Sequence, residues 1–153
     1  MKMKLYAIIG SPNARKSSCI RALTGAAVRG FYTMATAHGL VKCFVQIKAL
    51  QEDGRAPGAF TEEMRQAGAG VAIISLRIRA LNRQGHNYPA GIEYLNQFVG
   101  VGWDVRPIVV LGLDEQGQEG QALAGFHPHF FQDAANLPTN QTAAQIRRLW
   151  EFI

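Results

Sequence analysis

The sequence contains few cysteines and no long hydrophobic run. Its 153 residues include two cysteines, Cys19 and Cys43, which are too few to hold a chain of this length together by disulfides. No apolar stretch approaches the roughly 18 residues that a membrane-spanning helix requires, and the run at residues 5–9 is too short for a secretory signal peptide. We therefore expect a cytoplasmic protein with reduced thiols and no membrane partner.

Charge runs, internal repeats and low-complexity segments are missing as well. With 18% charged and 48% hydrophobic residues, the composition excludes a disordered chain and favours one globular domain over residues 1–153. The net charge of +5 is spread along the chain without a five-residue basic block. Such a charge permits contact with phosphate-rich partners but does not by itself indicate one.

Strand and helix patterns alternate along the chain. Apolar runs predict strands at residues 5–9, 71–76 and 105–113, and a hairpin at residues 31–36 and 41–50. Helical spacing of apolar residues predicts helices over 16–23, from Thr61 after a loop at 51–60, from Pro89, and from Thr142 to Ile153. This alternation is typical of an α/β fold, a three-layer α/β/α sandwich with a mostly parallel sheet.

The segment between the first predicted strand and the first predicted helix has the pattern of a phosphate-binding loop. Backbone N–H groups at such a place, together with the helix N-terminus, present partial positive charge to phosphate oxygens. The predicted nucleotide-binding residues are Gly10, Ser11, Pro12, Asn13, Ala14, Arg15, Lys16, Ser17 and Ser18.

Lys16 and Ser17 occupy the last two positions of the pattern G-x-x-x-x-G-K-[ST]. In such a loop the lysine reaches the outer phosphates and the hydroxyl binds Mg²⁺, so we expect Mg²⁺ as the cofactor and Ser17 as its ligand. Arg15 stands where the pattern has its second glycine. The arginine either points outward and leaves the loop intact, or crowds the nucleotide, and the sequence leaves both alternatives open.

Residues 8–25, IIGSPNARKSSCIRALTG, resemble the first motif of the translation-factor-class GTPases, especially the ribosome-assembly and tRNA-modification enzymes. The resemblance covers residues 5–25 and implies a P-loop NTPase-like fold that binds a nucleotide with Mg²⁺. Arg15 departs from the motif. The matching residues are Gly10, Pro12, Asn13, Lys16, Ser17, Ser18, Ala22, Leu23, Thr24 and Gly25.

The further motifs of these GTPases are incomplete. Thr33 and Thr36 lie where a switch threonine is expected, but threonine is also a common strand residue. The D-x-P-G motif corresponds to residues 55–58, where Arg55 replaces the aspartate and Asp53 lies two residues earlier; a simple Pro-Gly turn is the favoured interpretation. The guanine-reading N-K-x-D motif is absent, and Asp114 is its one remnant.

Other candidate sites have structural alternatives. Asp114 and Glu115 follow an apolar strand, as in many ATPases, but their neighbours favour a solvated turn. Arg77, Arg79 and Arg83 form either an anion clamp or a solvated sheet edge. The segment His127–His129 lacks partners at metal-ligand spacing and is interpreted as a loop.

The sequence therefore predicts binding of a nucleoside triphosphate, ATP or GTP, with slow or absent hydrolysis. No residue is identified as catalytic, which leaves ATPase or GTPase activity open. The alternative is a non-catalytic interaction module on a P-loop fold, which would bind nucleic acid, a protein partner or another copy of itself.

Overall fold

The centre of the molecule is a mixed, mostly parallel sheet of seven strands, seen in a computed structural model that describes residues 2–11 and 14–153. The strand order is β2-β3-β4-β1-β8-β9, with β7 beside β1, and β2 alone among the described strands of this sheet runs antiparallel to its neighbour. The strands are β1 (Lys4–Gly10), β2 (Gly30–Thr36), β3 (Gly39–Ala49), β4 (Val71–Arg77), β7 (Asp104–Val105), β8 (Val109–Leu111) and β9 (His129–Phe131).

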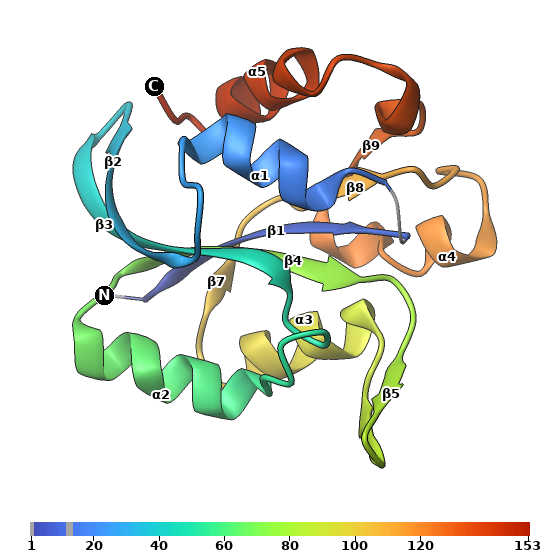
Figure 1. The fold of residues 1–153 in the computed structure, drawn as a ribbon, viewed down its shortest axis with the longest axis horizontal. Coiled ribbons are helices and arrows are strands. Elements are labelled where there is room, and N and C mark those ends of the chain that lie inside the picture. Colours follow the sequence, from blue (N-terminus) through green and yellow to red (C-terminus); the bar gives the residue numbers. More distant parts are fainter. Residues whose placement is uncertain (1, 12–13) are drawn as a thin grey trace.

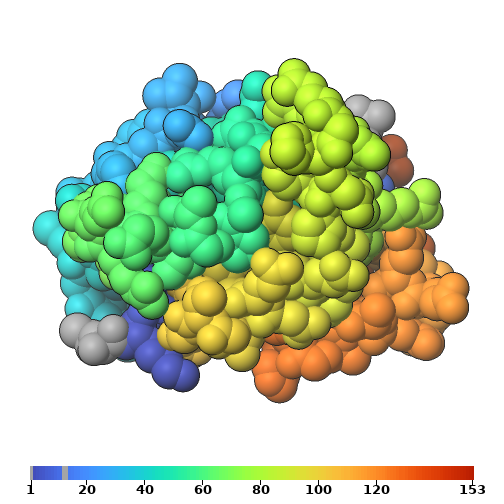
Figure 2. Space-filling view, turned by 90° about the horizontal axis from the view of Figure 1, so that it is seen from below, coloured from blue at the N-terminus to red at the C-terminus, as the bar shows by residue number. Residues whose placement is uncertain are grey.

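Helices cover both faces of the sheet (Figure 1). α1 and α5 pack together on one face, and α2 and α3 lie on the other. Figure 2 shows this second face, which the green, yellow and orange segments cover. The helices are α1 (Lys16–Thr24), α2 (Pro57–Ala67), α3 (Gly91–Gly100), α4 (Gln118–Gln121) and α5 (Thr139–Leu149), with short 3₁₀ turns at Ala124–Phe126 and Ala134–Asn136. A separate hairpin is formed by β5 (Leu81–Arg83) and β6 (His86–Tyr88).

Two hydrophobic clusters lie on either side of the sheet. Along β1, Leu5, Ala7 and Ile9 belong to the cluster under α2 and α3, whereas Tyr6 and Ile8 belong to the cluster under α1 and α5. Because both faces of β1 are covered, the strand is an almost continuous apolar run, as expected of a central parallel strand. The predicted α/β fold with a mostly parallel sheet is confirmed.

Several predicted elements have different limits in the structure. The predicted loop at residues 51–60 is wrong at its end, because Pro57 occupies the first turn of α2, where its missing N–H costs no hydrogen bond. The single strand predicted over 105–113 is split into β7 and β8 around Pro107, which cannot donate to the sheet.

The C-terminal helix also differs from its prediction. It begins at Thr139 and ends at Leu149. Ile153 lies beyond it and is 79% exposed, so this residue does not extend the helix's apolar face. Trp150 follows the helix and is buried. In the described part of the chain, no helix combines the length and apolar character needed to cross a membrane.

Candidate phosphate-loop site

The carboxyl ends of the parallel strands meet at one edge of the sheet, and the predicted phosphate loop starts there. The register places Gly10 of β1 beside Arg77 of β4 and Leu111 of β8. After β1, the chain runs through α1 to β2 and β3, which lie on one side of β1 in the sheet. After β8, the chain runs to β9, which lies on the other side. In open α/β sheets, ligands bind in the crevice at such a change of direction. Two residues of the predicted loop, Pro12 and Asn13, lie outside the described residues.

Lys16 lies at the base of this loop with its side chain largely buried. Its ammonium donates hydrogen bonds to the carbonyl oxygens of Gly10, at 3.2 Å, and Ser11, at 2.9 Å. Burial lowers the pKa of Lys16; the charge of Glu52 opposes this shift, and that of Arg77 adds to it. The Lys16 ammonium now donates to two neutral carbonyl oxygens. Anionic oxygens at the same place would accept stronger hydrogen bonds from it, because both partners would then be charged.

Arg15 has the backbone conformation that glycine favours. Its φ of 65° and ψ of 31° are left-handed, a conformation that glycine, the residue of the G-x-x-x-x-G-K pattern at this position, adopts without steric cost. The Arg15 guanidinium donates to the carbonyl oxygen of Leu137, at 3.3 Å, in the segment before α5. The arginine thus keeps the glycine-like backbone, and its guanidinium is held by a distant segment of the chain.

The first glycine of the loop is required by close packing. A Cβ atom on Gly10 would lie 2.5 Å from the carbonyl oxygen of Leu111, which is backbone and cannot move aside easily. Gly112, at the end of β8, has a φ of 73° and packs its backbone near Ala14. The loop after β1 is therefore braced by the end of β8.

A hollow of about 310 Å³ opens beside the N-terminus of α1. Ser17 lines it and donates its hydroxyl to the carbonyl oxygen of Ile47, at 3.3 Å. Ser75 of β4 is fully buried, and its hydroxyl oxygen has no hydrogen-bond partner among the described residues. The hollow is lined by Arg15, Lys16, Ser17, Ser18, Ala49, Glu52 and Ser75.

Glu52 and Ser75 were not predicted as site residues. The strand order brings them to Lys16, because β4 lies between β1 and β3 and the carboxyl ends of all three strands share one edge. A signal was present for each: Ser75 is a polar residue within the apolar run VAIISL, and Glu52 follows the second strand of the predicted hairpin. Neither signal identifies the loop that these residues approach.

The candidate switch residues do not gather at the hollow. Thr33 pairs with Lys42 and Thr36 with Gly39, at the amino end of β3 and therefore at the opposite edge of the sheet. Asp53 accepts hydrogen bonds from Arg29, at 3.3 Å, and from Gln46, at 2.6 Å. The predicted region of the D-x-P-G motif is occupied by the start of α2.

The remaining candidates have structural partners of their own. Asp114 is exposed and accepts a hydrogen bond from the Gln116 amide at 2.9 Å, which confirms a solvated turn after β8. The three arginines at and after the end of β4 do not form one clamp. Arg77 lies 3.7 Å from a carboxylate oxygen of Glu52, Arg79 pairs with Glu119 at 3.0 Å, and Arg83 donates to the Glu52 carbonyl.

No protein-family model matches this chain, and none of the curated proteins or solved structures gives a significant match to it.

Proposed function

We propose that this chain binds a nucleoside triphosphate, ATP or GTP, together with Mg²⁺ at the hollow beside α1, on a P-loop NTPase-like fold. The observation that carries the proposal is the position of Lys16. Its buried ammonium lies at the base of the loop that joins a buried parallel strand to a helix, at the carboxyl edge of the sheet. This is the arrangement in which a helix N-terminus and a lysine hold phosphate groups.

Two buried polar side chains of the hollow, Lys16 and Ser75, have roles in phosphate binding in this proposal. The Lys16 ammonium would exchange the carbonyl oxygens of Gly10 and Ser11 for β- and γ-phosphate oxygens. The first amides of α1 would bind the same phosphates. The buried hydroxyl of Ser75, which has no partner in the described part of the chain, would donate to the ligand or its hydration shell.

The residues present also fit Mg²⁺. Ser17 and Glu52 line one hollow and offer hydroxyl and carboxylate oxygens, which are the hard ligands that Mg²⁺ prefers. Among the described residues there is no cluster of three His, Cys, Asp or Glu side chains that would hold a metal alone. Mg²⁺ bound through one or two protein oxygens and the phosphates of the nucleotide agrees with such a site.

We expect hydrolysis to be slow or absent. Glu52 is the carboxylate that lines the described part of the hollow, and it would have to orient the attacking water. The Arg77 guanidinium lies 3.7 Å from it and competes for the same oxygen atoms. A carboxylate that both holds a cation and forms an ion pair with Arg77 is poorly placed to activate water as well.

Calorimetric titration tests the proposal. ATP and GTP are titrated, with and without Mg²⁺, into the wild-type protein and into Lys16→Met, which keeps the apolar stem of the buried lysine. We expect saturable binding by the wild type and at least about a tenfold loss of affinity in Lys16→Met, because charge-assisted hydrogen bonds to phosphate are removed.

Lys42→Met is the matched control. Lys42 lies on β3 at the opposite edge of the sheet and is exposed, so its replacement should leave nucleotide affinity unchanged. Equal binding by the wild type and Lys16→Met would contradict the proposal. A folded wild-type protein that binds neither nucleotide would favour the interaction-module alternative.

A further inference from the structure

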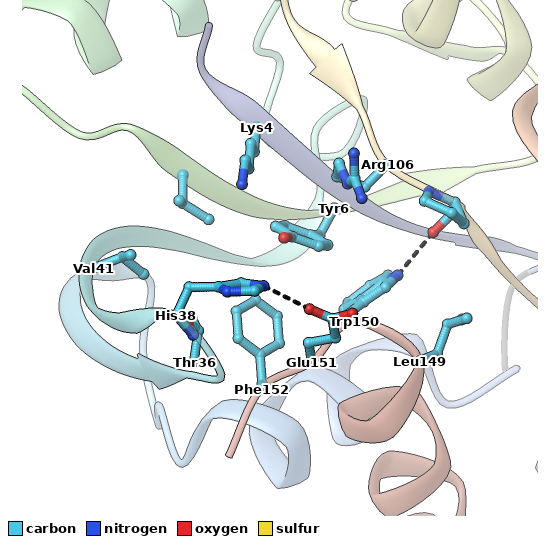
Figure 3. Close-up of a pocket in the computed structure, with 12 residues that line it drawn as sticks. Lys4, Tyr6, Thr36, His38, Val41, Arg106, Leu149, Trp150, Glu151 and Phe152 are labelled. Carbon is cyan, nitrogen blue, oxygen red and sulfur yellow. Dashed lines mark hydrogen bonds and ion pairs between the residues drawn. The ribbon is translucent and has the colours of Figure 1, made fainter. Parts of the chain in front are cut away.

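A second cavity lies at the amino edge of the sheet, opposite the phosphate loop (Figure 3). It encloses about 150 Å³ between the start of β1, the turn that joins β2 to β3, and residues 149–152. The backbone of the chain end is fixed there, because Ala37 donates to the Glu151 carbonyl and Ile153 to the Ala35 carbonyl, both at 2.9 Å. The cavity therefore has a wall built from three segments that are distant in the sequence.

Three aromatic rings form one side of this cavity. The ring centroid of Tyr6 lies 5.1 Å from that of Trp150 and 5.0 Å from that of Phe152. The indole N–H of Trp150 donates to the Pro107 carbonyl at 2.8 Å, which fixes the orientation of the ring. The Tyr6 ring is tilted by 57° to the Trp150 ring and by 55° to the Phe152 ring, so the cluster forms an angled apolar wall against which another aromatic ring can pack edge to face.

Two cationic side chains, Lys4 and Arg106, also line the cavity. Figure 3 shows the Lys4 ammonium and the Arg106 guanidinium above Tyr6. Lys4 makes no ion pair within the described residues, whereas Arg106 makes one long contact with Asp104, at 3.4 Å. The carboxylate of Glu151 is already engaged by His38, at 2.8 Å. Two cations thus face a cavity whose one carboxylate has a partner.

Tyr6 adds a neutral donor. Burial raises the pKa of its hydroxyl, so the phenol keeps its proton at neutral pH. The hydroxyl donates no hydrogen bond to another described residue of the chain. An acceptor entering the cavity would accept a hydrogen bond from this hydroxyl and face the charges of Lys4 and Arg106.

From these features we propose that the cavity is a binding site for a monocyclic aromatic carboxylate. The ring would lie against Tyr6, Trp150 and Phe152, and the carboxylate would accept from Tyr6, Lys4 and Arg106. A cavity of about 150 Å³ holds one six-membered ring. This site shares no lining residue with the phosphate-loop hollow, so the inference stands independently of nucleotide binding.

Titration with benzoate, followed by ¹H–¹⁵N spectra of the two tryptophan side chains, tests the proposal. The Trp150 indole N–H lies at the cavity, whereas that of Trp103 donates to Thr61, at 2.9 Å, in the cluster under α2 and α3 and serves as an internal reference. We expect a saturable shift of the Trp150 signal and none of the Trp103 signal. Arg106→Gln and Tyr6→Phe should each weaken benzoate binding about tenfold, and Lys48→Gln, at the other edge, should not.

Benzamide and acetate separate the two parts of the ligand. Benzamide has the ring without the charge, and acetate has the charge without the ring, so each should bind at least about tenfold more weakly than benzoate. Equal binding of benzoate and acetate would overturn the aromatic part of the proposal. The absence of a saturable Trp150 shift with benzoate, or unchanged binding in both site variants with wild-type-like spectra, would overturn the site.

Discussion

Arg15 holds a left-handed backbone in the loop that carries the proposed function, with φ 65° and ψ 31°. An L-residue in this conformation costs about 1–2 kcal/mol relative to an ordinary helical one, whereas glycine avoids that cost but loses some chain entropy on folding. We expect Arg15→Gly to leave the free energy of unfolding unchanged or raise it by up to about 1 kcal/mol. Arg15→Val should lower it by about 1–2 kcal/mol, because a β-branched residue is strained at positive φ. Urea unfolding of both variants decides this; a valine variant as stable as the glycine variant would contradict the assigned backbone.

Gly10 is needed for a different reason, which is the approach of β8. A Cβ atom added at Gly10 would lie 2.5 Å from the Leu111 carbonyl oxygen. Gly10→Ala should therefore lower the free energy of unfolding by about 1–3 kcal/mol, as at other overpacked sites. Gly100, at the end of α3, has nothing within 4 Å of such a Cβ. Gly100→Ala should therefore be neutral or raise stability by up to about 1 kcal/mol through helix propensity. Thermal unfolding of the pair measures the difference, and equal effects would show that β8 does not press on the loop.

Between elements, Thr61 joins α2 to the segment that follows α3. Its hydroxyl donates to the Pro57 carbonyl at 2.6 Å and accepts from the Trp103 indole at 2.9 Å, and both side chains are buried. Thr61→Val should lower the free energy of unfolding by about 1–3 kcal/mol, because the indole N–H loses its partner inside the core. Thr61→Ser keeps the hydroxyl and should retain most of this stability. Denaturant unfolding compares the two variants, and a valine variant as stable as the wild type would contradict the role of this hydrogen bond.

The elements that sequence patterns predicted are those defined by local signals. The apolar run of β1, the spacing of Cys19, Ile20 and Leu23 in α1, and the β2–β3 hairpin are each visible within a few residues. What the patterns did not show depends on pairing between distant segments. The insertion of β4 between β1 and β3 brings Glu52 and Ser75 to Lys16, and no local periodicity encodes the order of strands in a sheet. For the same reason the cavity around Tyr6 and Trp150 was not predicted.

At the scale of the whole molecule, the net charge of +5 makes non-specific binding of nucleic acid the main competing explanation for any phosphate affinity. The two explanations differ in their dependence on salt. A protein that contacts 6 to 10 backbone phosphates loses about a thousandfold or more in affinity between about 50 and 200 mM salt. A nucleotide held with Mg²⁺ at one buried lysine should lose about tenfold or less. Titrations of Mg²⁺-ATP, Mg²⁺-GTP and a single-stranded oligonucleotide at both salt concentrations test this; a steep slope for the nucleotide would contradict a specific site.

The central claim is that Lys16 exchanges backbone carbonyls for the phosphates of a nucleotide. A crystal structure of the protein with Mg²⁺ and a non-hydrolysable analogue of ATP or GTP tests it most directly. We predict that the Lys16 ammonium leaves the carbonyl oxygens of Gly10 and Ser11, which it now contacts at 3.2 and 2.9 Å, and lies within hydrogen-bond distance of the β- and γ-phosphate oxygens. A nucleotide bound elsewhere, or phosphates at the loop with Lys16 still bound to both carbonyls, would contradict the account.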